Sequence, residues 1–226
     1  MMITRKVATA LAAGRTMIIK PSEQTPLTAY KLLEYARKAG IPEGVFEMVT
    51  GNPKEIGKLF TGDTRIRKLP FTGSTAVGKL LASTCGKDLK RMTLELGGNA
   101  PFIVFDDSDF ETAVASAVAA KLRNSGQVCI SPNRFYVQSG VFDRFVAAVT
   151  DRGAEIRVDQ GLQEEFVVGP MASKAGYDKV VELVKDARNC GAKVVLKHSG
   201  YGREGSHYGI EEYVEVKYVL MSGRDR

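Results

Sequence analysis

An acid and a thiol that could perform chemistry together lie in the stretch from Met92 to Arg134. Glu95 precedes a pair of glycines, and Cys129 follows a predicted helix and the dipeptide Gly126–Gln127. A thiol at a helix–loop junction can act as a nucleophile, and a carboxylate that the fold brings near it can activate a water molecule. An isolated cysteine is more often a small buried apolar residue. The spacing of the two residues leaves both interpretations open.

Two sequence signatures around these residues resemble the aldehyde dehydrogenase superfamily. They are LELGGNAPFIVF, which contains Glu95, and RNSGQVC, which ends at Cys129. The resemblance implies that the Cys129 thiolate attacks an aldehyde carbon and that the resulting thiohemiacetal passes a hydride to a nicotinamide. It further implies that Glu95 is the general base that activates water to hydrolyse the thioester, and that the amide of Cys129 belongs to an oxyanion hole.

A second motif, FTGSTAVGK, contains a turn from a strand into a helix. Gly73 permits a tight turn there, and Ser74 with the free amides of the helix start could bind phosphate. An ordinary capped turn is the alternative. The resemblance makes this turn part of a dinucleotide site and adds Lys20 and Glu23 at the adenosine ribose. Because the carboxylate of Glu23 repels a 2′-phosphate, we expect NAD rather than NADP. The expected cofactor-binding residues are Lys20, Ser22, Glu23, Phe71, Thr72, Gly73, Ser74, Leu96 and Gly97.

Within the superfamily, the chain resembles the succinate-semialdehyde dehydrogenase group most closely. The likeness is carried by MITRK near the N-terminus, KLRNSG before the thiol and the tail GYGREGSHYGIEEYVEVKYV. It implies that Arg5, Arg123 and Ser199 bind the distal carboxylate of a small aldehyde substrate, since guanidinium groups pair well with carboxylates. For a single arginine the ordinary alternative is a solvated surface charge.

Composition restricts the other classes of function. The 226 residues contain 44% hydrophobic residues and carry a net charge of +6, with Lys and Arg interpreted as scattered among 26 acids. No nucleic-acid-binding motif accompanies the charge, so we expect no nucleic-acid partner. The three cysteines form no CxxC pair and only two histidines are present, so neither a metal site nor a disulfide framework is expected. No apolar run is long enough for a membrane span. The expected location is cytoplasmic, with a mitochondrial presequence as the alternative for the basic N-terminus.

Strands alternate with helices along the chain, which predicts a parallel α/β sheet. We expect an aldehyde dehydrogenase-like α/β fold in three parts: an incomplete Rossmann-like NAD-binding domain (1–96), a partial catalytic domain (97–196) and a tail with an oligomerisation-type strand (197–226). Expected helices cover 3–13, 28–39, 54–60, 74–85, 108–124, 141–149 and 174–189, and a capping box at Ser108 is expected to open the helix over 108–124. Expected strands cover 16–20, 45–49, 66–71, 101–105, 135–138, 193–196 and 213–220, of which 101–105 is expected to be buried.

The resemblance also implies missing parts. The family places nucleotide-binding strands and an oxyanion-hole asparagine before the segment that matches Met1, and most of the catalytic domain between the segments that meet near Val195 to Lys197. Part of an oligomerisation hairpin is absent too. Pro70 would interrupt a central strand, and Ser131 replaces a cysteine common in relatives. The rival hypothesis is therefore a catalytically inactive fragment that binds a dinucleotide or another subunit, and homo-oligomer formation is left open.

Overall fold

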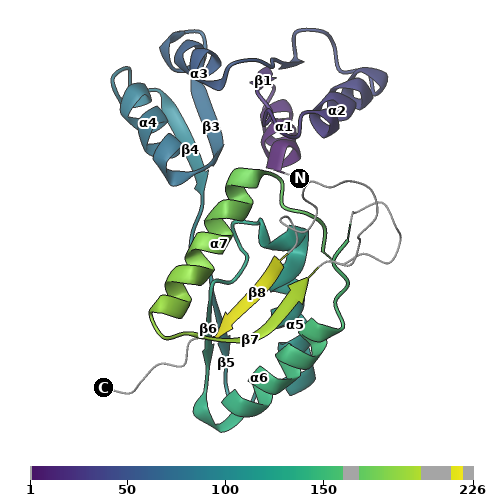
Figure 1. The fold of residues 1–226 in the computed structure, drawn as a ribbon. Helices are drawn as coiled ribbons and strands as arrows, with labels where there is room; N and C mark the ends of the chain where they lie inside the picture. The colour runs from purple at the N-terminus through teal and green to yellow at the C-terminus, as the bar shows by residue number, and fades with distance from the viewer. Residues whose placement is uncertain (1, 160–167, 200–214, 221–226) are drawn as a thin grey trace, which may run out of the picture. The chain divides into compact units, whose positions relative to one another are not determined.

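The computed structural model describes residues 2–159, 168–199 and 215–220, with the backbone alone for 197–199 and 215–220. The chain divides into two compact units, Met1–Gly97 and Gly98–Arg226. Each unit mixes helices with short strand pairs, as expected for a partial α/β fold (Figure 1).

The first unit consists of four helices and four strands in strict alternation. They are α1 (Met2–Ala12), β1 (Met17–Ile19), α2 (Leu27–Lys38), β2 (Phe46–Met48), α3 (Pro53–Gly62), β3 (Lys68–Gly73), α4 (Thr75–Gly86) and β4 (Arg91–Leu96). The strands pair in parallel, β1 with β2 and β3 with β4, as two separate two-stranded sheets. The expected helices and strands of this unit are confirmed to within a few residues, and β4 is an additional strand.

A small hydrophobic core joins α1, β1, α2 and β2. Its buried members are Val7, Ile19, Ala29 and Phe46, one from each element. The helical spacing of apolar residues in α1 and α2 places these side chains on the faces turned to the strands. Gly40, with φ +86°, follows α2 in the left-handed conformation that glycine adopts at least cost.

The β3–β4 sheet has one apolar and one polar face. Register pairs on the apolar face are Leu69–Met92, Phe71–Leu94 and Gly73–Leu96. Gly78 lets α4 approach this face closely, because a Cβ there would lie 2.6 Å from a methyl group of Leu96. Among the described residues β3 pairs with β4 alone, so the structure does not place Pro70 in a central strand, and proline is tolerated at a strand edge.

The second unit contains the remaining elements. They are β5 (Pro101–Val104), α5 (Phe110–Leu122), the short turn η1 (Arg123–Gly126), β6 (Arg134–Val137), α6 (Ser139–Ala154), α7 (Lys174–Asn189), β7 (Lys193–Ser199) and β8 (Glu215–Leu220). Strand β5 pairs in parallel with β6, and β7 pairs antiparallel with β8. The tail strand, whose partner the sequence left open, thus pairs within its own chain.

Two local expectations in this unit are wrong. The strand at 101–105 is not buried throughout, because Ile103 is 56% exposed while Val104 packs in a core with Val114, Ala117 and Phe145. The expected Ser108 capping box does not begin α5. Asp109 is the N-cap and accepts a hydrogen bond from the amide of Thr112, because two capping residues stand side by side and the helix starts one residue later.

Candidate active site

Cys129 lies exposed in a turn between η1 and β6. The chain reaches it through three consecutive left-handed residues: Asn124 (φ 53°), Ser125 (φ 56°) and Gly126 (φ 74°). For a residue other than glycine this conformation costs about 1–2 kcal/mol. Such strain persists only where surrounding contacts fix the backbone, so the contacts of this turn determine how the thiol is presented.

Side chains upstream of the thiol attach the turn to a distant segment. The Ser125 hydroxyl donates to the carbonyl of Gly169 at 2.9 Å. The side-chain oxygen of Gln127 accepts from the amide of Ala172 at 3.0 Å. The Asn124 amide donates to the carbonyl of Gln127 at 3.3 Å and closes the turn on itself. These bonds hold the left-handed residues in place.

Side chains downstream of the thiol attach the turn to the end of α5. Ser131 is 3% exposed, and its hydroxyl donates to the carbonyl of Lys121 at 3.1 Å. The ammonium of Lys121 donates in turn to the carbonyl of Pro132 at 2.9 Å and to Asn133 Oδ1 at 3.3 Å. Burial lowers the pKa of Lys121. Ser131 therefore anchors the loop that carries Cys129 to the end of α5.

Glu95 lies on the exposed polar face of β4, where its register partner on β3 is Thr72. The ammonium of Lys6, on α1, donates to the Thr72 hydroxyl. Directly paired residues of neighbouring strands have Cβ atoms about 5 Å apart, so the residue that Lys6 contacts is the cross-strand neighbour of the expected general base. Lys6 was not among the expected site residues. Its position in MITRK, next to Arg5, was the available signal.

The adenosine-side residues meet in a hollow at the carboxyl ends of β1 and β2. The hollow has a volume of about 230 Å³ and is lined by Lys20, Pro21, Ser22, Glu23, Pro26, Thr50 and Gly51. Lys20 and Glu23 form an ion pair inside it, and this hydrogen bond from Lys20 lowers the pKa of Glu23. The carboxyl edge of parallel strands is the usual place for a dinucleotide, and the donors and acceptors here suit a ribose.

The remaining expected cofactor residues surround the turn from β3 into α4. Ser74 is the N-cap of α4, and its side chain accepts from the amide of Val77 at 3.4 Å. The ring of Phe71 lies close to Gly73: a Cβ at this position would be 2.5 Å from the ring, so a side chain here would require the ring to move. Leu96 is the last residue of β4, and Gly97 follows it. The uncapped amides of α4 can still bind an anion.

The three residues expected to hold the substrate are divided between the two units. Arg5 is exposed on α1 in the first unit, and Arg123 is exposed at the start of η1 in the second. Ser199 is the last residue of β7, and its side chain lies outside the described residues. Likewise Glu95 belongs to the first unit and Cys129 to the second, so the acid and the thiol have separate structural surroundings.

Among the residues that the structure describes, no group of three or more His, Cys, Asp and Glu side chains is placed to hold a metal ion. The helices of the same residues are all too short or too polar to cross a membrane.

Comparisons with known proteins relate the chain that carries these features to one family. The family model for the aldehyde dehydrogenase family matches residues 1–197. Succinate-semialdehyde dehydrogenase [NADP(+)] GabD of Escherichia coli is 46% identical over 95% of this chain and 45% of that protein. The crystal structure of succinate-semialdehyde dehydrogenase from Burkholderia pseudomallei matches with a TM-score of 0.85 at 42% identity, over 95% of this chain and 44% of that one. The chain thus spans about half the length of these relatives.

A third relative shows that the match is interrupted. 3-Sulfolactaldehyde dehydrogenase of Pseudomonas putida is 45% identical over 324 positions, which cover all of this chain and 67% of that protein. Since the chain has 226 residues, 324 − 226 = 98 of these positions have no counterpart in it. This comparison is consistent with the expected internal deletion.

Proposed function

This chain belongs to the aldehyde dehydrogenase family, and from that premise we propose that it carries out NAD-dependent oxidation of an aldehyde to a carboxylic acid. The observation that carries the proposal is the presentation of Cys129: an exposed thiol on a strained turn that Ser125, Gln127 and Ser131 hold from both sides. A fixed, accessible thiol is what nucleophilic catalysis requires.

The proposed steps use two residues of the chain. The Cys129 thiolate adds to the carbonyl carbon, and the carbonyl oxygen becomes the alkoxide of a thiohemiacetal. NAD, when bound, would supply hydride acceptance. Loss of the hydride from the thiohemiacetal would leave a thioester on Cys129. Glu95 removes a proton from water as the water attacks the thioester, which releases the carboxylic acid and the thiolate.

The proposed substrate is a small aldehyde with a distal carboxylate, succinate semialdehyde first of all. The support is the likeness to succinate-semialdehyde dehydrogenases and the presence of Arg5, Arg123 and Ser199 at the matching positions. The homo-oligomer, the cytoplasmic location and the division into 1–96, 97–196 and 197–226 stay predictions.

The decisive experiment measures NADH formation by the purified chain with succinate semialdehyde and NAD. We expect Cys129→Ala to abolish NADH formation. Cys190→Ala, which removes another exposed thiol, should leave it unchanged. Equal rates in the wild type and Cys129→Ala, or no NADH from a folded wild-type chain, would contradict catalysis by this chain.

The second candidate function is a dinucleotide-binding or subunit-interaction remnant without turnover. The observation that favours it is the 98-position interruption of the match to a relative. It predicts that NAD raises the melting temperature of the chain while no NADH forms.

The preference for NAD over NADP is a separate proposal that rests on Glu23. In the ligand-free hollow this carboxylate pairs with Lys20, and a 2′-phosphate would bring two further negative charges against it. We expect Glu23→Gln to improve NADP binding at least several-fold relative to NAD, measured by calorimetric titration. An unchanged ratio would instead fit the NADP(+) named for the Escherichia coli relative.

A further inference from the structure

Lys121, in the last turn of α5, approaches the chain on both sides of Cys129. Its carbonyl oxygen accepts a hydrogen bond from the hydroxyl of Ser131, two residues after the thiol, at 3.1 Å. The same carbonyl oxygen would lie 3.3 Å from a Cβ placed on Gly126, three residues before the thiol. A single backbone carbonyl therefore borders both ends of the turn that presents Cys129.

The side chain of Lys121 adds two further contacts with this loop. Its ammonium donates to the carbonyl of Pro132 at 2.9 Å and to Asn133 Oδ1 at 3.3 Å. Together with the bond from Ser131, these contacts attach three consecutive residues of the loop to the end of α5. Lys121 is half-buried, and a charged group withdrawn from water needs such acceptors. The ammonium is thus fixed by the loop and fixes the loop in return.

Asn133 extends these contacts to the first residues of the second unit. Its side-chain nitrogen donates to the carbonyl of Gly98 at 3.4 Å and to Asn99 Oδ1 at 3.2 Å. Its backbone amide donates to the carbonyl of Ala100 at 3.2 Å. The Lys121 ammonium binds the oxygen of the same side-chain amide. It therefore favours the orientation in which the nitrogen of Asn133 points to residues 98–99.

We propose that Lys121 is a positioning residue for Cys129. Its ammonium holds residues 131–133 against the end of α5, and this attachment keeps the left-handed turn at 124–126 in the conformation that presents the thiol. Lys121 acts through the loop and takes no part in bond formation. The proposal rests on the proposed function, because a misplacement of about 1 Å near a reacting group can cost roughly a hundredfold in rate.

Amide hydrogen exchange tests this attachment without any turnover. The amide of Ser131 donates to the carbonyl of Val128 at 3.0 Å and closes the turn that contains Cys129. Lys121→Met keeps an unbranched apolar side chain and removes the ammonium. We expect this variant to speed exchange at the amide of Ser131 at least tenfold, because the turn opens more often once the loop is released.

Two controls separate this local effect from general unfolding and from loss of charge. The amide of Gln138 donates to the carbonyl of Val104 at 2.9 Å, beyond the loop, and its exchange should be the same in Lys121→Met and the wild type. Lys185→Met removes an exposed ammonium from α7 and should alter exchange at neither amide.

Steady-state kinetics supply a readout of positioning in the same variants. We expect Lys121→Met to lower kcat for NADH formation at least tenfold, per folded molecule, and to change KM for NAD less than twofold. The reason is that the hydrogen bonds of Lys121 go to the loop of Cys129, whereas the residues expected to bind NAD belong to the first unit. Lys185→Met should leave both constants unchanged.

Unchanged exchange at Ser131, equal acceleration at Ser131 and Gln138, or faster exchange at Ser131 with unchanged kcat would each overturn the proposal. If Lys121→Met does not fold, the uncharged and shorter side chain of Lys121→Gln takes its place. Loss of folding in both variants would assign Lys121 to the stability of the whole unit and would also overturn it. A folded wild-type chain that forms no NADH contradicts the proposed function instead, and exchange at Ser131 then decides the role of Lys121.

Discussion

The three cysteines differ in accessibility, and accessibility decides which thiol can react. Cys85 is 1% exposed, and burial raises its pKa, whereas Cys129 and Cys190 are exposed. Because only the thiolate is nucleophilic, we expect iodoacetamide to label Cys129 and Cys190 in the native chain and to spare Cys85. Peptide mass mapping before and after denaturation measures this. Rapid native labelling of Cys85 would show that the α4–β4 packing opens readily.

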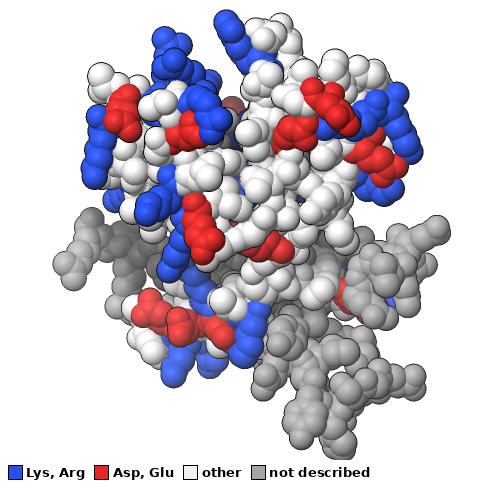
Figure 2. Space-filling model, turned by 90° about the horizontal axis from the view of Figure 1, so that it is seen from above, with Lys and Arg blue, Asp and Glu red and all other residues white. Residues whose placement is uncertain are grey.

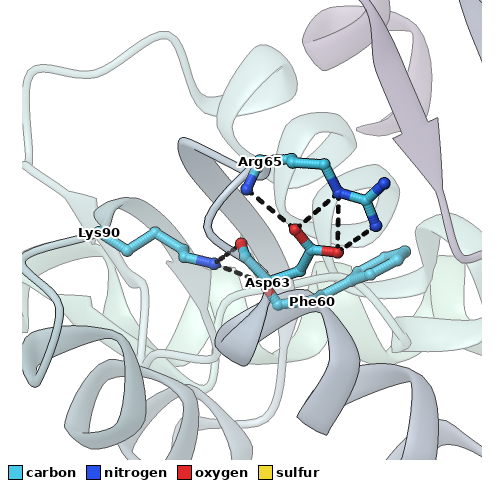
Figure 3. Close-up of polar contacts among 4 residues, drawn as sticks. All are labelled: Phe60, Asp63, Arg65 and Lys90. Carbon is cyan, nitrogen blue, oxygen red and sulfur yellow. Dashed lines mark hydrogen bonds and ion pairs between the residues drawn. The ribbon is translucent and has the colours of Figure 1, made fainter.

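The carboxyl group of Asp63 has a pKa well below its usual range. The Arg65 guanidinium and amide donate to its carboxylate and lower its pKa to about 2 (Figure 3). The pKa is depressed in the folded chain, so the stabilisation is fully present above the unfolded value of about 3.9 and is lost as pH falls through about 2. An NMR titration should place the midpoint near 2.

A substitution tests the cause of that displacement. Arg65→Gln should raise the pKa of Asp63 toward its ordinary value, because it removes the charged donor whose hydrogen bonds lower that pKa most. Arg67→Gln is the matched control and should leave the pKa of Asp63 unchanged. Equal effects of both substitutions would assign the shift to the general charge of the segment.

At the scale of elements, Lys90 joins the end of α3 to the start of β4. Its ammonium donates to the carbonyls of Phe60 at 2.8 Å and Asp63 at 2.9 Å (Figure 3). A cation at a helix C-terminus satisfies free carbonyls and complements the helix dipole. We expect Lys90→Met to destabilise the chain by about 1–3 kcal/mol, measured by urea unfolding. Lys87→Met, at an exposed position, should change it by less than about 0.5 kcal/mol.

The turn before Cys129 gives a second prediction at this scale. Gly126 has φ 74°, and a Cβ there would lie 3.3 Å from the carbonyl oxygen of Lys121. Gly126→Ala should therefore cost about 1–2 kcal/mol and lower the melting temperature by several degrees. Gly169→Ala is the control, since it has open space around it and no left-handed φ. Equal melting temperatures for both variants would mean that the turn adopts another conformation.

At the scale of the whole molecule, charge is divided unequally between the units. Residues 1–97 contain 16 Lys and Arg and 8 Asp and Glu, a net charge of 16 − 8 = +8, while residues 98–226 contain 16 and 18, a net charge of −2. Figure 2 shows both signs interspersed on one face. Basic residues are thus mixed with acidic ones, and the excess of positive charge lies with the unit that carries the expected phosphate-binding turn.

The two units also have separate cores, which predicts separate unfolding. Val7, Ile19, Ala29 and Phe46 form a core in the first unit, and Val104, Val114, Ala117 and Phe145 form one in the second. We expect Lys90→Met to speed amide exchange in β3 and β4 and Gly126→Ala to speed it in β5 and β6, each without affecting the other pair. Exchange that accelerates equally in all four strands would indicate a single cooperative unit.

The sequence by itself determined the order of the elements and the chemistry-bearing motifs. Helices such as 174–189 follow from apolar spacing and from a terminal glycine, Gly191, because these signals act over one or two helical turns. The match of Glu95 and Cys129 to family signatures is equally local. Where two adjacent residues could both cap α5, the local pattern predicted Ser108, whereas Asp109 is the N-cap in the structure.

Only the tertiary structure decided which segments distant in sequence meet. The donation from Lys6 to Thr72, the anchoring of the Cys129 loop by Ser131, and the pairing of β8 with β7 join residues that no local pattern relates. So does the division of the first unit's strands into two parallel pairs, β1 with β2 and β3 with β4. The physical reason is that a strand's pattern specifies the faces it buries, whereas its neighbours depend on which edges the rest of the fold brings to it.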